Sequence, residues 1–302
     1  QKKLLEDRLK ITASARYDKA QNFDGNVSPR LSLSYAAGED KNHNFRASIQ
    51  TGFRNPTTQD QYIGLDAGSG ILVGTAPDNI DRYRSMPYPL GINQGLAGYL
   101  NAVGGTNIGS TQVLTGDMAY NNSWSASSIG AFLSSGNPAD LKKSNIDFVK
   151  PEFVTAYEVG YRGVIEGFTL DVSAYFNMYN DFIASRNAVA PLYGSVALND
   201  AVDIAPAVGS PVPMPTPVAL IALQSGDFKG VAFDSNSDSD ISSYGLGIGV
   251  SKKVFDGFNL GVNYTYAKFE ETGGSNPDFE AGFNTPEHKV KVQFGKEKLF
   301  KN

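Results

Sequence analysis

Few residues of this chain have the types and spacing that covalent catalysis needs. Its 302 residues include no cysteine and only two histidines, His43 and His288. His43 is expected in a short turn and His288 at the start of a strand, where solvent or interface roles are the simpler interpretation. No Ser-His-Asp set and no catalytic carboxylate pair is visible by spacing. We therefore predict that the chain is not an enzyme and needs no cofactor.

One acidic run has the residue types of a calcium site. Its oxygen-bearing side chains alternate along the chain at Asp234, Asn236, Asp238 and Asp240. An EF-hand loop would need Gly where Ser239 stands and Glu where Gly245 stands, so that motif fails. A looser calcium site in an external loop stays open as an alternative to a solvated loop, and we predict no metal site.

Two further patterns resemble binding motifs only superficially. Gly245-x-Gly247-x-Gly249 is spaced like part of a nucleotide loop, but it lies within an alternating strand and leads into no helix. Small residues facing a barrel interior explain it better. The prolines of a later segment form a polyproline-type stretch, at Pro206, Pro211, Pro213, Pro215 and Pro217. A stiffened external loop is the favoured interpretation, and a ligand for a partner protein is the alternative.

The remaining candidates are polar side chains that would bind a ligand without reacting with it. They are Arg54, Asn55, Glu158, Tyr175 and Asn177. Each lies in or beside a segment of alternating apolar and polar residues, so their position depends on how those segments pair. Their alternative role is to line a wet wall and contact another domain.

Eight segments alternate apolar and polar residues with a period of two, as two-faced β-strands do. They cover residues 9–17, 30–35, 45–54, 157–162, 168–179, 244–251, 258–266 and 289–294. About ten residues, rising ~3.3 Å each at a tilt of ~40°, cross roughly 25 Å, the apolar height of an outer membrane. The pattern predicts an all-β fold, a transmembrane antiparallel β-barrel.

The connections between these segments alternate between short and long. Residues 36–44, 163–167 and 252–257 are short, while 55–152, 184–240 and 270–286 are long, and 18–28 is intermediate. A membrane barrel has brief periplasmic turns on one side and extended external loops on the other. Aromatic residues near both ends of most strands fit two interfacial girdles. A soluble β-sandwich, the alternative, must explain both features separately.

Composition narrows the function classes further. The net charge of −5 gives no basic footprint for nucleic acid, and no stretch reaches the ~20 apolar residues of a membrane helix.

Short helices are expected within the largest loop at 91–103 and 137–143, the second capped by Asn137 with Pro138 in its first turn. That loop is expected to fold over the barrel mouth and contact ligand.

Several stretches resemble TonB-dependent receptors, particularly those of the Bacteroidota. The stretches are residues 16–19, 28–31, 45–48, 50–57, 150–152, 157–162, 179–183, 263–266 and 283–289. The most specific are Gly52-Phe53-Arg54-Asn55-Pro56-Thr57 and Tyr157-Glu158-Val159-Gly160-Tyr161. Together they touch all eight strands, whereas the long loops match nothing that we can place.

The resemblance implies a barrel of about twenty-two strands around an N-terminal plug, driven by the TonB complex. Residues 1–302 would then be part of the barrel domain, without the plug, the TonB box and the first and last strands. We expect the start to be internal, because no signal peptide is present, and the end at Leu299–Asn302 to be a turn. Eight strands with open edges are not tolerated in lipid, so partner strands are expected.

The function that follows from this resemblance is active import of a nutrient across the outer membrane. Its class, whether siderophore, cobalamin, glycan or peptide, stays open. The expected partners are the TonB complex through the plug, and outer-membrane lipid and lipopolysaccharide. Whether a surface lipoprotein also binds is left open by the sequence. The alternatives are a passive porin or channel, which would lack plug and TonB box, and a surface adhesin, whose deletion would cause no uptake defect.

Overall fold

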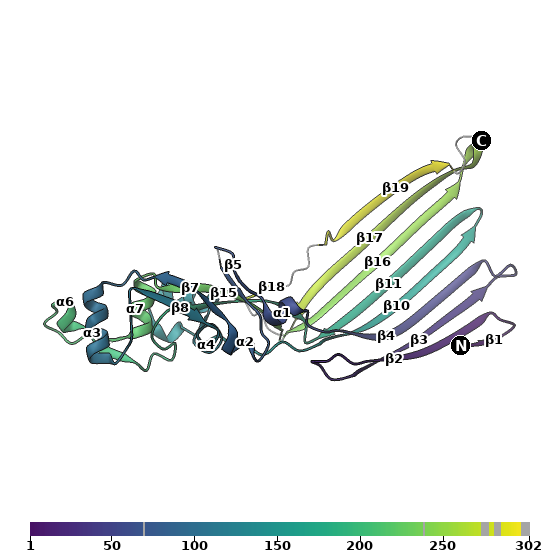
Figure 1. Cartoon of the computed structure of the whole chain (residues 1–302). Helices are drawn as coiled ribbons and strands as arrows, with labels where there is room; N and C mark the ends of the chain where they lie inside the picture. The colour runs from purple at the N-terminus through teal and green to yellow at the C-terminus, as the bar shows by residue number, and fades with distance from the viewer. Residues whose placement is uncertain (69, 238, 273–277, 281–284, 297–302) are drawn as a thin grey trace, which may run out of the picture.

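The computed structural model describes residues 1–302 except 69, 238, 273–277, 281–284 and 297–302. Asp238 of the acidic run, the first part of the 283–289 stretch and the turn at 299–302 therefore lie outside the described residues. The described chain forms a sheet of long strands with a second folded unit at one end of it (Figure 1).

The large sheet is antiparallel, and nine strands build it from the described residues. In spatial order they are β1 (Lys2–Leu4), β2 (Leu9–Asp18), β3 (Asn26–Ala37), β4 (His43–Arg54), β10 (Glu152–Ile165), β11 (Phe168–Asn180), β16 (Asp240–Lys253), β17 (Phe258–Thr272) and β19 (His288–Lys296). Eight were predicted. β1 was not, because three residues are too few to show a period.

The register gives this sheet one apolar and one polar face. In one row Leu33 lies opposite Ala47, which lies opposite Val159, and the row continues through Ala174 to Leu246. These side chains point away from the polar face and many of their neighbours are exposed, among them Tyr157 and Phe176. Large apolar side chains left open to this extent require an apolar surrounding. This face is the lipid-facing side of a transmembrane barrel wall.

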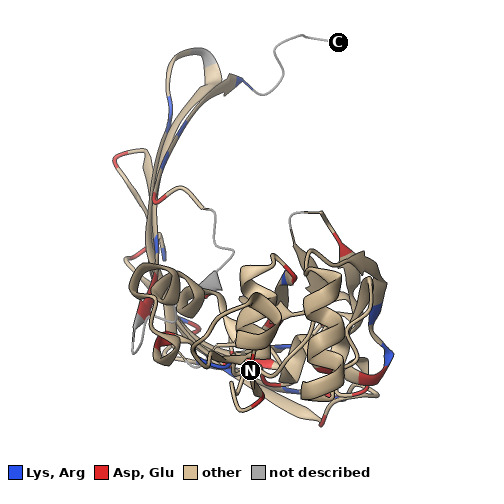
Figure 2. Ribbon diagram, turned by 90° about the vertical axis from the view of Figure 1, so that its left-hand side faces the viewer, with Lys and Arg blue, Asp and Glu red and all other residues tan. Residues whose placement is uncertain are grey.

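The short connections lie at one end of the sheet and the long connections at the other, as predicted. β10 and β11 are joined by Glu166 and Gly167, with φ values of 50° and 78° that suit a tight hairpin turn. The chain between β4 and β10 and the chain between β11 and β16 both leave from the opposite end. Seen from that end, the sheet forms an arc and these connections lie on the side toward which the arc opens (Figure 2).

The two longest connections pack together into one folded unit, which we call the loop body (residues 55–151 and 182–237). Its main sheet contains β5 (Gly64–Asp66), β6 (Ile71–Val73), β12 (Ile183–Pro191) and β15 (Phe228–Asn236), with β9 (Trp124–Ser125) paired to β12. A strand of the third long connection, β18 (Phe279–Glu280), also pairs with β12. Two antiparallel two-stranded sheets complete its strands, β7 (Arg84–Pro89) with β8 (Thr111–Thr115) and β13 (Ala201–Asp203) with β14 (Pro215–Pro217). β6, from the first connection, pairs in parallel with β15, from the second. This pairing joins the two connections.

The loop body has its own hydrophobic core. Leu100, Leu114, Val218 and Phe233 are fully buried in it, and they come from both connections. Its helices are α1 (Thr58–Tyr62), α2 (Asn79–Arg82), α3 (Gln94–Gly104), α4 (Gly116–Asn121), α5 (Ala126–Ser135), α6 (Ala205–Val208) and α7 (Val218–Gln224), with a 3-10 turn at Pro138–Asp140. A second 3-10 turn, Phe255–Gly257, joins β16 to β17. No helix among the described residues has the length and apolar character needed to cross a membrane.

Both helices expected in the largest loop are present in shortened form. α3 begins after Asn93, whose Oδ1 accepts from the N–H groups of Gly95 at 2.8 Å and Leu96 at 3.2 Å. The segment from Asn137 forms only a single 3-10 turn, which Asn137 caps by accepting from Ala139 N–H at 3.1 Å. The Asn137 cap was predicted, whereas the Asn93 cap was not, and the helix lengths depend on packing that capping residues do not encode.

Candidate functional site: a polar barrel wall beneath the loop body

Three of the predicted binding residues share the polar face near the middle of the sheet. Glu158 of β10 lies opposite Tyr175 of β11, and Asn177 lies two residues farther toward the loop body. All three line a hollow of about 320 Å³, together with Ser48 and Gln50 of β4. Adjacent strands therefore present a carboxylate, a phenol and amides to one space, and this combination can hydrogen-bond a polar ligand.

Arg46 of β4 is a further polar residue of this wall, and our sequence reasoning did not select it. Its Nε lies 3.6 Å from Glu158 Oε1, and its Nη2 lies 3.3 Å from Asp171 Oδ1. The side chain crosses Gly160, where an added Cβ would lie 2.6 Å from Arg46 Nε. The alternation of residues 45–54 already placed Arg46 on the polar face, but only the register shows which carboxylates it reaches.

The glycines of β16 leave room for side chains on the same face. At Gly245 an added Cβ would lie 2.5 Å from both Tyr175 Cε1 and the Tyr266 carbonyl oxygen. Gly247, two residues farther along, has only Ser173 Oγ nearby, at 3.1 Å. The Gly-x-Gly-x-Gly run is thus part of the wall, as predicted, and Gly245 makes space for the Tyr175 ring.

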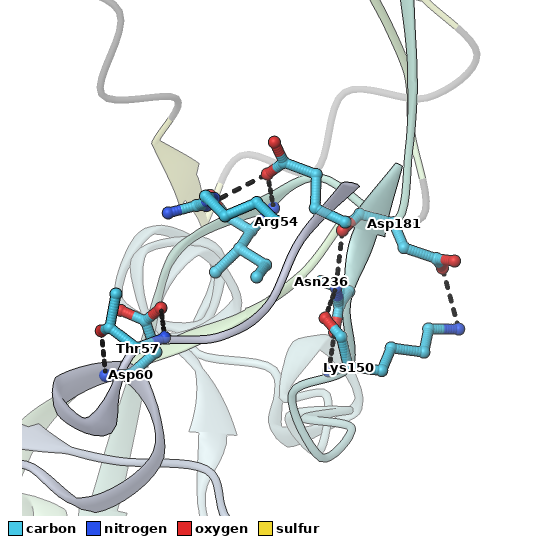
Figure 3. A network of polar contacts seen from close by, with 8 residues as sticks. Arg54, Thr57, Asp60, Lys150, Asp181 and Asn236 are labelled. Carbon is cyan, nitrogen blue, oxygen red and sulfur yellow. Dashed lines mark hydrogen bonds and ion pairs between the residues drawn. The ribbon is translucent and has the colours of Figure 1, made fainter. Parts of the chain in front are cut away.

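The other two predicted residues lie apart from this group, where the wall meets the loop body. Arg54 is the last residue of β4, and its Nη2 donates to Glu152 Oε2 at 3.0 Å (Figure 3). The same oxygen accepts from Ile183 N–H at 2.9 Å, and Arg54 also donates to the Ile183 carbonyl at 3.3 Å. Glu152 was not among our candidates, although it lies on the same strand face as Glu158.

Asn55 lies just beyond the wall strand, as one of the candidates expected in or beside a strand. β4 ends at Arg54, so Asn55 belongs to the segment that enters the loop body. Its Oδ1 is buried and has no hydrogen-bond partner within the described residues. Arg54 and Asn55 therefore belong to the junction between wall and loop body, while the other three residues form the wall.

Asn236, the second residue of the acidic run, hydrogen-bonds to two other segments of the junction. Its Oδ1 accepts from Lys150 N–H at 2.8 Å, and its Nδ2 donates to the carbonyls of Lys150 at 2.9 Å and Asp181 at 2.6 Å (Figure 3). Lys150 Nζ lies 2.8 Å from Asp181 Oδ1. The amide of Asn236 is thus used by backbone groups, and no group of three metal-binding side chains exists among the described residues.

Asp234, the first residue of that run, lies in a partly buried position on β15. Burial raises the pKa of its carboxyl group, the negative charge of Asp60 adds to the rise, and Arg54 opposes it. Asp60 in turn forms a capping box with Thr57 at the start of α1, with contacts of 2.8 Å and 3.1 Å. The carboxyl group of Asp234 is therefore protonated more readily than an exposed one.

Each histidine contacts a tyrosine hydroxyl, and two of the prolines lie in a paired strand. His43, which begins β4 and is not in the turn where we expected it, lies 2.7 Å from Tyr161 Oη, and His288 lies 2.9 Å from Tyr264 Oη. Pro215 and Pro217 lie in β14, which pairs with β13. Pro206, at the other end of the stretch, lies in α6, so the five prolines do not form one extended polyproline segment.

The comparisons with known proteins come from a family model and from solved structures. The family model described as "TonB dependent receptor-like, beta-barrel" matches residues 3–298, nearly the whole chain. Among curated proteins, the comparison finds no significant match.

The solved structures that match this chain have low sequence identity to it, and their titles name siderophore and hemophore receptors. The siderophore receptor PirA from Pseudomonas aeruginosa is 15% identical over 87% of this chain, with a TM-score of 0.42. PirA from Acinetobacter baumannii is 12% identical over 95%, with a TM-score of 0.46, and the Serratia marcescens hemophore receptor HasR is 11% identical over 95%, with a TM-score of 0.42. The chain spans 32%, 29% and 36% of these three proteins.

Proposed function

Because this chain belongs to the TonB-dependent receptor-like β-barrel family, we propose that it is part of a receptor that actively imports a nutrient across the outer membrane. In this proposal residues 1–302 belong to the barrel domain, of the Bacteroidota type, and the plug and the other strands come from the rest of the protein. The TonB complex acts through that plug. The match over residues 3–298 is the observation that carries the proposal.

The two parts of the chain have separate tasks in this scheme. The loop body, at the end of the sheet with the long connections, meets the nutrient first. The polar face below it, with Glu158, Tyr175 and Asn177, then lines the path beside the plug. A folded loop unit on a rigid sheet supports selective capture, because binding groups held by a packed scaffold lose little freedom when ligand binds.

The proposal is tested by uptake in cells that carry the full-length gene, its deletion, or the gene with its TonB box altered. Growth on defined single sources of iron, cobalamin, glycan and peptide identifies the nutrient. We expect the deletion to abolish growth on one source, and the altered TonB box to abolish it equally. Wall variants Asn177→Ala and Glu158→Gln are expected to lower uptake, whereas Phe176→Leu on the lipid face is the matched control.

The same experiment separates the rival functions. A passive channel would keep its uptake when the TonB box is altered, or would have no such box. A surface adhesin would show no uptake defect on any source after deletion. Either result would contradict active import. Co-purification of the full-length receptor with lipopolysaccharide or with a surface lipoprotein would identify the other partners that we propose.

A further inference from the structure

The third long connection, which joins β17 to β19, contacts the loop body through residues 278–280. Its strand β18 pairs with β12 at Ser185 and Arg186. The next N–H group of β12, that of Asn187, donates to the Asp278 carbonyl oxygen at 3.0 Å. β9 of the first connection pairs with the residues of β12 that follow. Since β15 occupies the other edge of β12, the first and third connections share one edge of this strand.

The Asp278 side chain caps a helix that belongs to the first connection. This side chain is buried, and its Oδ1 accepts from the Ser127 N–H at 2.6 Å. Its Oδ2 accepts from the Ser127 hydroxyl at 3.0 Å and from the Ser125 hydroxyl. Ser125 stands at the N-cap of α5, but its own side chain makes no capping bond to the helix. The carboxylate of Asp278 therefore takes the place of the local cap, where the positive end of the helix dipole also favours it.

This contact is separate from the core of the loop body. The described core residues, among them Leu100 and Phe233, all come from the first two connections. β18 is only two residues long, so its backbone pairing alone is a weak attachment. Small peripheral units open at a lower free energy than a packed core does. The attachment of the third connection can therefore open while the core remains intact.

We propose that residues 278–280 form a latch, which fastens the β17–β19 hairpin to the loop body and opens while the core of the loop body stays folded. Opening frees one edge of β12 and the start of α5. It also lets the β17–β19 hairpin move apart from the loop body, and during import this separation gives the nutrient its way past the loop body. That last step rests on the proposed function, whereas the latch itself does not.

Hydrogen exchange of the full-length receptor in detergent, read by mass spectrometry with single-residue fragmentation, tests the latch. The reporter is the Asn187 amide, because Asp278→Ala removes a side chain but keeps the backbone carbonyl that this amide uses. We expect Asn187 to exchange about tenfold faster in Asp278→Ala, as the loss of about one charged hydrogen bond implies. The amides of α7, inside the core, should keep their rates. In the unaltered receptor Asn187 should already exchange faster than they do.

Asp117→Ala is the matched control for this measurement. Asp117 is an exposed carboxylate in the first turn of α4, and it accepts from Asn121 of the same helix, so it joins no second connection. It should leave Asn187 unchanged. Unchanged exchange at Asn187 in Asp278→Ala would overturn the latch. So would equal acceleration of α7, because Asp278 would then support the core itself, or equal rates for Asn187 and α7 in the unaltered receptor.

A disulfide tests the import step. Ser127→Cys with Asp278→Cys places two thiols where Ser127 Oγ and Asp278 Oδ2 lie 3.0 Å apart, and the chain itself contains no cysteine. Ser135→Cys with Asp140→Cys is the control pair, since these side chains also touch but belong to one connection. We expect oxidation of the first pair to abolish uptake of the source identified by growth, and reduction to restore it. The control pair should show no change.

The two experiments fail in different ways. Equal uptake by the oxidised and reduced forms of the Ser127→Cys, Asp278→Cys receptor would overturn the role of the latch in import. If the unaltered receptor imports none of the sources, the import function itself has failed. Exchange at Asn187, measured on purified protein, still decides in that case whether the latch exists.

Discussion

Arg54 and Glu152 lie opposite each other in the last pair of the β4–β10 register, with 3.0 Å between Arg54 Nη2 and Glu152 Oε2. Their residue numbers differ by 98. All 97 residues between them belong to the first connection of the loop body, whose two ends this pair brings together. The carboxylate also accepts from Ile183 N–H, the first residue of β12. One side chain therefore joins both connections to the wall.

Glu152→Ala is expected to loosen this junction. Its loss leaves the Ile183 N–H without its acceptor and the Arg54 guanidinium without its carboxylate, which costs about 1–3 kcal/mol for local opening. Hydrogen exchange of the full-length protein, followed by mass spectrometry of a peptide that spans Ile183, should show faster exchange there. Asp18→Ala, which removes the exposed Arg16–Asp18 pair, is the control. Unchanged exchange at Ile183 would refute the role of Glu152.

Asn236→Asp tests the second contact of the junction with a nearly isosteric change. The amide nitrogen donates to two carbonyl oxygens, and an aspartate oxygen in its place would face both of them as a second acceptor. We expect a loss of about 2 kcal/mol or more, measured as lower thermal stability of the loop body by resistance to thermolysin. Asn22→Asp, in an exposed loop, should change little. Equal resistance of the two variants would contradict the prediction.

Gly245→Ala and Gly247→Ala form a matched pair on one face of β16. The added methyl group at 245 meets a backbone carbonyl oxygen at 2.5 Å, which cannot move without distorting the sheet, whereas at 247 it meets a movable hydroxyl at 3.1 Å. We expect Gly245→Ala to destabilise the barrel by about 1–3 kcal/mol more than Gly247→Ala. The temperature at which each folded barrel unfolds in a gel-mobility assay measures the difference. Identical temperatures would count against the observed packing.

Asp234→Asn should stabilise the loop body in a pH-dependent way. Burial raises the pKa of Asp234 in the folded protein, so its ionised form disfavours the fold above the ordinary Asp value of about 3.8. The asparagine removes this penalty. Its advantage is therefore complete above the raised pKa, shrinks as the pH falls through it, and is absent below the ordinary value. Calorimetry at pH 7 and pH 3 measures it, with Asp81→Asn as the control. An equal advantage at both pH values would exclude this cause.

The strands of the barrel wall could be predicted because the alternation of apolar and polar residues is visible within each strand segment. Alternation over residues such as 168–179 requires only that one face meets lipid and the other meets water, and each strand reports this by itself. The polar-face positions of Glu158, Tyr175 and Asn177 follow from the same parity. What parity cannot give is the neighbour across the register, so the contacts of Arg46 and Glu152 appeared only in the structure.

The loop body could not be predicted, because its elements depend on each other. β12 and β15 alternate in burial, but their residue types do not show it, because Arg186 and Ser235 are among the buried positions. α7 is apolar from Val218 to Leu223, so it has no polar face that would show a helical period. Helices shorter than about twelve residues are marginal without tertiary packing. The parallel pairing of Ile71 with Val231 joins segments that no local pattern relates. Gly, Pro and Asn residues indicated loops correctly but gave no sign that the loops share a core.

The loop body is continuous with four adjacent strands, β4, β10, β11 and β16, and this limits how it moves. A flap swings on one or two flexible points, whereas a unit carried by four neighbouring strands cannot rotate without bending the wall. Its orientation is therefore coupled to the curvature of the barrel beneath it. Any force that reshapes the wall from inside would tilt the loop body, so that a mechanical event in the lumen would be transmitted to the cell surface.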